Sequence, residues 1–229
     1  MDIINQLTAR IRLFHEFQME QLTNHPEYGL NGDIRISLLT KLLFSMTGYQ
    51  LSLIHSEIQL KDRGWWDHFF NDQVNDQDIQ LRTSSYNHIS LIGFFQGIFM
   101  SLESSLRSIS IALDPSKNKD GKAEFANIYK FIFARLNLHK YNDLFDILRL
   151  IRNTNHNNGM FIPVRSGNLS ITYKGRTFDF KENKLVEYLN QVDNSNLYYF
   201  LDEILLFLNE LFNHSDILAI TKIEEKVSL

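Results

Sequence analysis

The chain has 229 residues, of which 44% are hydrophobic and 18 are phenylalanines, which is enough for one large core or two small adjoining ones. It has no cysteine, which excludes disulfides, thiolate metal sites and thiol nucleophiles and favours a reducing compartment. The net charge of −4 argues against an extended nucleic-acid surface, and the amino terminus lacks the pattern of a signal peptide. Because polar and charged residues interrupt the apolar stretches, we expect a cytoplasmic protein without a membrane span.

Only three prolines and ten glycines interrupt the chain, which favours helices. Apolar residues at steps of three and four from Ile3 to Phe17 predict a first helix that ends at Asn24-His25-Pro26. Residues 26–32 are expected to form a loop. Asp33 is the predicted N-cap of a second helix, which bends at Gly48 and continues through Ile58.

A short aromatic helix is predicted around the sequence Trp65-Trp66. Ser84 or Ser85 is the predicted cap of a long helix that ends at Asp114-Pro115, and a polar loop, 116–122, follows it. Two more helices are expected, from Phe125 to Leu136 and from about Asn142 to His156. Any domain boundary is expected near residues 75–85.

The apolar pattern then changes period. Residues 169–173 and 177–180 alternate with period two, and Lys174-Gly175-Arg176 lies between them, so the sequence predicts a small β-hairpin. A last long helix begins near Ser195. The predicted fold class is therefore all-α, a helical bundle with one hairpin insertion.

The segment Arg149–Gly159 combines residues suited to chemistry. On a helix, Arg152 and His156 are four residues apart and share a face, Arg149 lies two turns from His156, and Asn153 flanks them. Histidine transfers protons near neutral pH, and arginine binds phosphate. No matching cluster of acids indicates a Mg²⁺ site, and metal-free phosphodiester cleavage needs an internal nucleophile, which RNA supplies in its 2′-hydroxyl.

This segment resembles the signature of the HEPN superfamily of small helical-bundle proteins, many of which are metal-independent ribonucleases. The family pattern is Arg, four to six residues, then His, often with Asn after the Arg. Six residues separate Arg149 from His156, whereas Arg152-Asn153 supplies the Arg-Asn pair with only three residues before His156. The extension from His156 to Gly159 resembles some subfamilies, and Glu103 with Arg107 resembles an acid–base pair of the family.

The resemblance implies three segments: a helical extension over 1–80, a HEPN-like core over 84–216 with its hairpin near 169–180, and a tail over 217–229. It also implies a homodimeric, metal-independent endoribonuclease of a toxin, defence or stress system, without a cofactor or resident metal. RNA, an antitoxin or another protein are the expected partners, with no membrane contact. The alternative is a non-catalytic module that binds RNA, a nucleotide or a protein.

On this resemblance, His156 acts as acid or base, Arg152 or Arg149 holds the scissile phosphate, and Asn153 orients the pair. The hypothetical substrate contacts are Asn157, Lys174 and Arg176. The simpler interpretations stay open. His156 could only cap its helix, and the arginines could only pair with Asp143, Asp146 or the acidic last helix.

Three further features each have two interpretations. Glu103 and Arg107 fit an intrahelical ion pair, and the aromatic cluster around Trp65 fits a core or dimer interface better than a base-stacking platform. Residues 130–176 contain eight basic and two acidic residues, a local charge of +6, whereas nine acids and three lysines follow from Glu182 onward. This asymmetry indicates either an anion site or internal ion pairing.

Overall fold

A computed structural model describes residues 2–30, 32–71, 73–116, 123–157, 159–164, 166–186, 188 and 195–225. Its elements, in chain order, are α1 (Asp2–Asn24), α2 (Pro26–Leu30), α3 (Ile34–His55), the π-helical turn η1 (Ser56–Leu60), α4 (Arg63–Phe70), α5 (Asp76–Leu113), α6 (Phe125–Arg135), the 3-10 turn η2 (His139–Tyr141), α7 (Asn142–His156), β1 (Leu169–Tyr173), β2 (Arg176–Phe180), α8 (Ser195–Phe212) and α9 (Ser215–Leu218). The expected all-α bundle with one small hairpin is confirmed.

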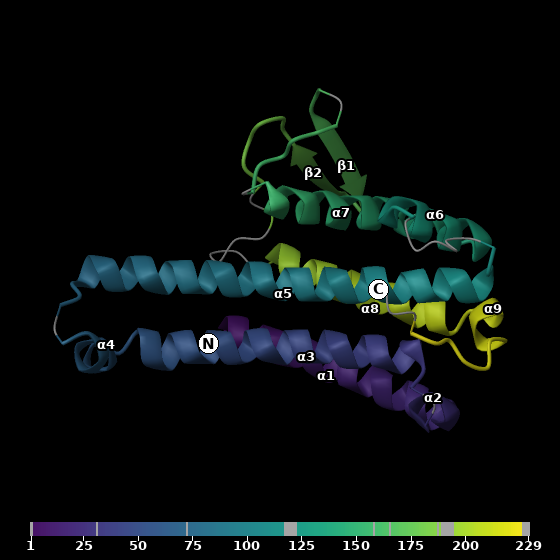
Figure 1. Ribbon diagram of the computed structural model, residues 1–229, viewed down its shortest axis with the longest axis horizontal. Helices are drawn as coiled ribbons and strands as arrows, with labels where there is room; N and C mark the ends of the chain where they lie inside the picture. Colours follow the sequence, from purple (N-terminus) through teal and green to yellow (C-terminus); the bar gives the residue numbers. More distant parts are fainter. Residues whose placement is uncertain are drawn as a thin grey trace.

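The long helix α5 lies at the centre of the bundle (Figure 1). α3 packs along one side of it and α1 packs against α3, whereas α6 and α7 pack on another side of α5, and α8 contacts α1. One hydrophobic cluster includes buried residues from α1, α3, α5, α6, α7 and α8. The described part of the chain therefore shares a core across the boundary expected at residues 75–85, and α5 itself runs through residues 80–84.

By length and composition alone, α5 could cross a membrane. Its most apolar 18-residue window has a mean hydropathy of 1.3, and 44% of that window is buried inside the bundle. The central helix of a helical bundle has the same composition because it contacts neighbours on several sides.

The helix starts show where local chemistry governs the fold. Asp33 caps α3 as predicted, and its carboxylate accepts the N–H of Arg35 at 2.9 Å. The predicted cap of α5 at Ser84 or Ser85 is wrong, because Asn75 Oδ1 accepts the N–H of Asp78 at 2.9 Å and the helix begins there. The predicted loop 26–32 is also wrong in part, since residues 26–30 form α2, which buries Tyr28.

Two other expectations can be compared with the described residues, and a third largely cannot. The aromatic helix is confirmed as α4, and α3 is helical through Gly48, with the irregular π-helical turn following His55. Most of the predicted loop 116–122 lies outside the described residues.

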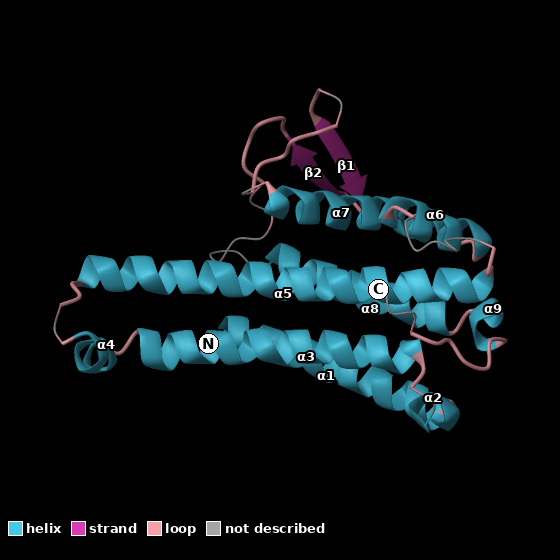
Figure 2. Cartoon of the chain, viewed as in Figure 1, coloured by secondary structure: helices cyan, strands magenta, loops and turns pink. Residues whose placement is uncertain are grey.

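The hairpin forms as predicted and covers α7 on the outside of the bundle (Figure 2). Its strands are antiparallel, and Tyr173 pairs with Arg176, so Arg176 begins β2 instead of lying in the turn. The two turn residues, Lys174 and Gly175, have φ angles of 46° and 79°. Positive φ at both positions is typical of the tight type I′ hairpin turn.

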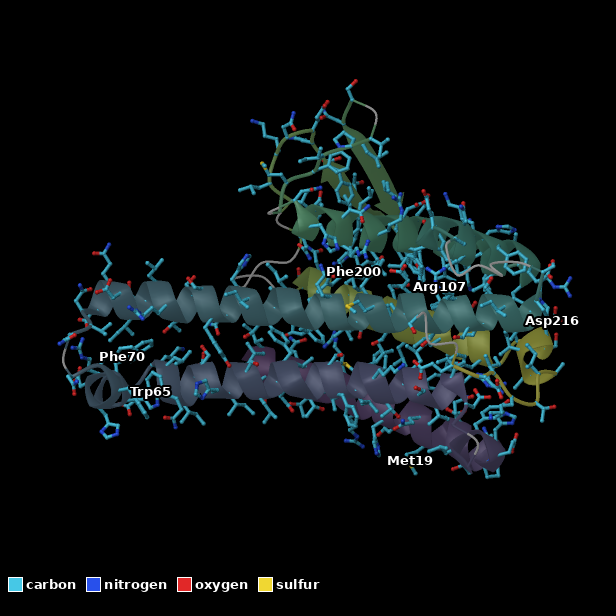
Figure 3. The ribbon with its side chains drawn as sticks, in the orientation of Figure 1. Met19, Trp65, Phe70, Arg107, Phe200 and Asp216 are labelled. Carbon is cyan, nitrogen blue, oxygen red and sulfur yellow. The ribbon has the colours of Figure 1, made fainter. Side chains whose placement is uncertain are left out.

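Residues 51–89, which we call the arm, comprise the end of α3, η1, α4 and the start of α5. The arm extends past the carboxyl end of α7 and the start of α8 (Figure 1). A small separate cluster of Leu60, Trp66 and Val74 holds its tip, where Trp66 Nε1 donates to the carbonyl of Leu60 at 2.9 Å. Figure 3 shows Trp65 and Phe70 at this end of the molecule. Trp66 is therefore a core residue, whereas Phe69 is 61% exposed.

The described part of the predicted tail is packed into the bundle. Ile217 and Ile223 are 0% and 1% exposed, and the N–H of Ile223 donates to Asp33 at 2.8 Å. Arg35 is fully buried beside them. Its guanidinium binds both carboxylate oxygens of Asp33 and also donates to Tyr28 and to the carbonyl of Ile217.

Candidate functional site

The candidate site lies at the carboxyl end of α7. This helix buries an apolar face formed by Leu144, Leu148 and Ile151, which holds it against the bundle. The helix stops as predicted, because the N–H groups of Asn157 and Gly159 both donate to the carbonyl of Thr154, and Gly159 has a φ of 81°. The intervening residue, Asn158, lies outside the described part of the chain.

Arg152 projects from α7 toward α5. Its Nη2 lies 3.9 Å from Oε2 of Glu103, and its guanidinium lies 5.3 Å from the ring centroid of Phe99. Its Nη1 donates to Oδ1 of Asn153 at 3.4 Å. Since 3.9 Å is beyond hydrogen-bond range, the ion pair leaves the guanidinium with donors that an anion could use.

Glu103 joins two arginines. The expected intrahelical ion pair with Arg107 is present, at 3.4 Å between Arg107 Nη2 and Glu103 Oε1, and Arg107 Nη1 also donates to the carbonyl of Ala123 at 3.0 Å. Figure 3 shows Arg107 between α5 and the layer of α6 and α7. Glu103 therefore has a second partner across the helix interface, in Arg152, which intrahelical spacing alone could not reveal.

Arg149, Arg152 and His156 lie on one side of α7, which we call the stripe, but Arg149 has a different environment. Its Nη2 lies 3.2 Å from Oδ1 of Asp146, which also accepts the hydroxyl of Tyr129 at 2.6 Å. Burial, and then the hydrogen bond to Asp146, raises the pKa of Tyr129 above its ordinary value. The structure thus contains the predicted Arg149–Asp146 pair, whereas the partner of Arg152 is on α5 and not among those expected.

His156 is exposed at the end of the helix, one turn beyond Arg152. Within the described residues, no hydrogen bond or ion pair occupies its imidazole. The described part of the chain therefore leaves both ring nitrogens open to a ligand. An exposed histidine next to an arginine that retains free donors is suited to proton transfer on a bound anion.

Asn153 and Asn157 line a small cavity on the other flank of the stripe. It has a volume of about 220 Å³, includes Arg149, and is closed by the apolar segment 161–164 and Leu169. The side chain of Asn157 donates to the carbonyl of Asn153 at 3.2 Å. This bond ties Asn157 to the helix end, where it also acts as the C-cap residue.

Lys174 and Arg176 are not brought to this cavity. Lys174 Nζ lies 2.7 Å from the buried carboxylate of Glu203 on α8. The guanidinium carbon of Arg176 lies 4.2 Å from the ring centroid of Tyr199. Leu169, at the opposite end of β1, is the hairpin residue that lines the cavity. A strand of five residues separates the two ends by about 13 Å.

The local excess of positive charge is largely offset by ion pairs. Every described basic residue of the segment 130–176 except Arg176 pairs with an acid: Lys130 and Arg149 with Asp146, Arg135 with Asp216, Lys140 with Glu210, Arg152 with Glu103, and Lys174 with Glu203. Arg165 lies outside the described residues. Of the two interpretations, internal ion pairing is the one that these contacts favour.

The fold and site together define a helical bundle in which the end of one helix, carrying Arg, Asn and His, lies against an acid–base pair on the central helix. Comparisons with protein-family models, with curated proteins and with solved structures give no match. No group of three or more potential metal-ligating side chains occurs among the described residues.

Proposed function

We propose that this protein is a HEPN-like, metal-independent endoribonuclease that works as a cytoplasmic homodimer in a toxin, defence or stress system. The observation that carries the proposal is the juxtaposition of Glu103 and Arg152 beside the exposed His156. Glu103 and Arg152 are about fifty positions apart in the sequence and both belong to segments that resemble HEPN proteins, so their contact supports the proposal.

The proposed chemistry is cleavage by the RNA's own 2′-hydroxyl. His156 takes the proton of that hydroxyl or returns a proton to the leaving 5′-oxygen, and a second copy of the motif supplies the complementary group. The 2′-oxygen forms a bond to phosphorus as the bond to the 5′-oxygen breaks, leaving a 2′,3′-cyclic phosphate. Arg152 stabilises the charge that grows on the phosphate, and Glu103 and Asn153 hold its guanidinium.

A second candidate is a non-catalytic HEPN-like module that binds RNA, a nucleotide or a protein partner. The ion pairs of residues 130–176 favour it. Because most of these basic side chains already have acidic partners, the surface offers fewer free cations for a long RNA than the sequence indicates.

The test compares wild-type protein with His156→Ala on total RNA in EDTA. His139→Ala is the matched control, since His139 is also exposed but lies at the other end of α7, about 20 Å away along a 15-residue helix. We expect cleavage by wild type and the control, 2′,3′-cyclic phosphate ends, and a rate about 10²- to 10⁴-fold lower for His156→Ala.

The folded, dimeric state of each variant is checked first by circular dichroism and by mass in solution. Intact RNA with wild type would reject the nuclease and favour the binding module. Equal cleavage by His156→Ala would reject His156 as the group that transfers protons.

A further inference from the structure

Two long stretches of neighbouring helices carry no acidic or basic residue other than histidine. They are residues 42–55 of α3 and 83–102 of α5. The two helices run antiparallel and side by side (Figure 1), with the rings of Tyr49 and Phe94 stacked at 4.8 Å and Gly97 next to Ser45. Their outward sides therefore form one continuous surface, which we call the charge-free face.

This face exposes large apolar side chains. Phe44, Leu51, Ile89 and Met100 are 73%, 61%, 69% and 63% exposed. The outer side of α1 shows the ordinary pattern for a solvated helix, with an exposed ion pair between Arg12 and Glu16. Depletion of charge with exposed aromatic, aliphatic and methionine side chains is typical of the centre of a protein–protein interface.

We propose that the charge-free face binds a second copy of this chain. A partner with a charged surface would lose hydration there and gain no ion pair, whereas an identical face is complementary to it by symmetry. A hydrocarbon environment fits less well, because the exposed polar side chains of Thr47 and His88 lie within the same stretches and would lack hydrogen-bond partners.

The size of the face suits a dimer. Twenty residues of α5 are about 30 Å long, and two helices side by side are about 20 Å wide, which gives roughly 600 Å² per copy. A dimer would then bury about 1,200 Å² in total, the lower end of the range for specific complexes. Gly48 and Gly93 have open space beside them, so the helices of two copies can approach closely there.

The stretch of α5 that carries the face also contacts the candidate site, through a residue buried on its inner side. Arg152 lies against Phe99, which belongs to the charge-free stretch of α5. Because α7 runs antiparallel to α5 (Figure 1), His156 lies further toward the amino-terminal half of that stretch. The interface is inferred from the surface of α3 and α5 alone. Only the view that it lies beside a catalytic site rests on the proposed function.

The absence of cysteine allows a direct test of this interface. Four single-cysteine variants on the face, Leu51→Cys, Ile89→Cys, Gly93→Cys and Met100→Cys, are treated with a short bismaleimide linker. The matched control is Leu206→Cys, because Leu206 is 49% exposed on α8, away from the face. Because a two-fold axis brings only nearby residues close to their own copies, we expect covalent dimers from at least one variant on the face, the one nearest the axis, and none from the control at the same concentration.

A second experiment places charge on the face. Mass in solution by light scattering should be twice 27.0 kDa for wild type and for Leu206→Glu. Leu51→Glu and Ile89→Glu, with unchanged helical content, should raise the dissociation constant of the dimer at least 100-fold. RNA cleavage is assayed separately, so a dimer that cuts no RNA would reject only the nuclease.

Three outcomes would overturn the interface. These are a wild-type monomer at all concentrations up to about 100 μM, a dimer that both glutamate variants leave intact, and wild-type protein that instead binds neutral phosphatidylcholine vesicles through this face.

Discussion

Arg35 shows how one residue can connect distant parts of this chain. All five N–H donors of its guanidinium have partners: the two oxygens of Asp33, the hydroxyl of Tyr28, and the carbonyls of Ile217 and Ile220. The guanidinium also lies 3.5 Å from the ring centroid of Tyr28. A buried charge is tolerated only with such complete pairing, so removing one partner should be costly.

We predict that Arg35→Met lowers the free energy of unfolding by about 3–5 kcal/mol, because Asp33 would stay buried with an uncompensated charge. Arg12→Met breaks an exposed ion pair and should cost less than about 1 kcal/mol. Urea unfolding followed by circular dichroism measures both. Adding Asp33→Asn to Arg35→Met should cost less than the sum of the single effects. Equal costs for Arg35→Met and Arg12→Met would contradict the importance of this pair.

At the same scale, the sequence predicted the stripe of α7 but not its surroundings. Helical spacing places Arg149, Arg152 and His156 on one side, since it depends only on neighbours along the helix. The contact between Arg152 and Glu103 depends on how α5 and α7 pack, which no local pattern encodes. The position of Lys174 against buried Glu203 likewise depends on where the hairpin packs.

We predict that Glu103→Gln lowers RNA cleavage about tenfold or more without loss of stability beyond about 1 kcal/mol, because Arg152 would lose the group that holds its guanidinium. Glu16→Gln is the control, since Glu16 pairs only with exposed Arg12 among the described residues. Cleavage rates and urea midpoints are compared for both. An unchanged rate for Glu103→Gln would show that the cluster has only a structural role.

At the scale of elements, two glycines should respond in opposite ways to the same substitution. Gly175 has a φ of 79° and Gly48 lies within α3, and both have open space where a methyl group would go. Gly175→Ala should lower the free energy of unfolding by about 1 kcal/mol because the turn requires positive φ. In protein dilute enough to be monomeric, Gly48→Ala should raise it by about 0.5–1 kcal/mol because alanine favours the helix.

Unfolding of both variants at one fixed protein concentration measures the difference. A stabilising Gly175→Ala would show that the turn does not have positive φ at this position.

The start of α5 illustrates why element boundaries were harder to predict than the elements. Residues 76–83 belong to the arm, where the helix is largely exposed and needs no regular apolar pattern. Ser84 or Ser85 was predicted as the cap from the apolar pattern that follows it, and that pattern does not extend back to Asn75, where the helix begins. Inside the bundle, where burial on one face is required, the limits of α7 and α8 agreed with prediction.

For the whole molecule, tyrosines couple stability to alkaline pH. Burial is the largest cause that raises the pKa of four of them, Tyr49, Tyr129, Tyr141 and Tyr173. They stay neutral in the folded state and ionise near pH 10 when unfolded, so the folded state holds more protons above that pH. Their contribution is fully present below about pH 10 and is lost as pH rises further.

We therefore predict that the free energy of unfolding falls steeply above about pH 10, by up to about 1.4 kcal/mol per pH unit for each of these tyrosines. Urea titrations at several pH values measure the slope, and absorbance at 295 nm follows ionisation. Tyr173→Phe should reduce the slope. Ionisation of all tyrosines before any loss of helical signal would contradict this expectation.

The contacts of Arg35 also matter while the chain is being made. The side chain of Arg35 donates hydrogen bonds to the carbonyls of Ile217 and Ile220, which lie 182 and 185 positions later in the sequence. Asp33 accepts a hydrogen bond from the N–H of Ile223, which lies 190 positions later. The amino-terminal helices therefore leave the ribosome long before the residues that satisfy this buried charge. At about 5–20 residues per second, roughly ten to forty seconds pass in between. During that interval α1 and α3 present their apolar sides without α8, so chaperone binding to the nascent chain should be strongest then.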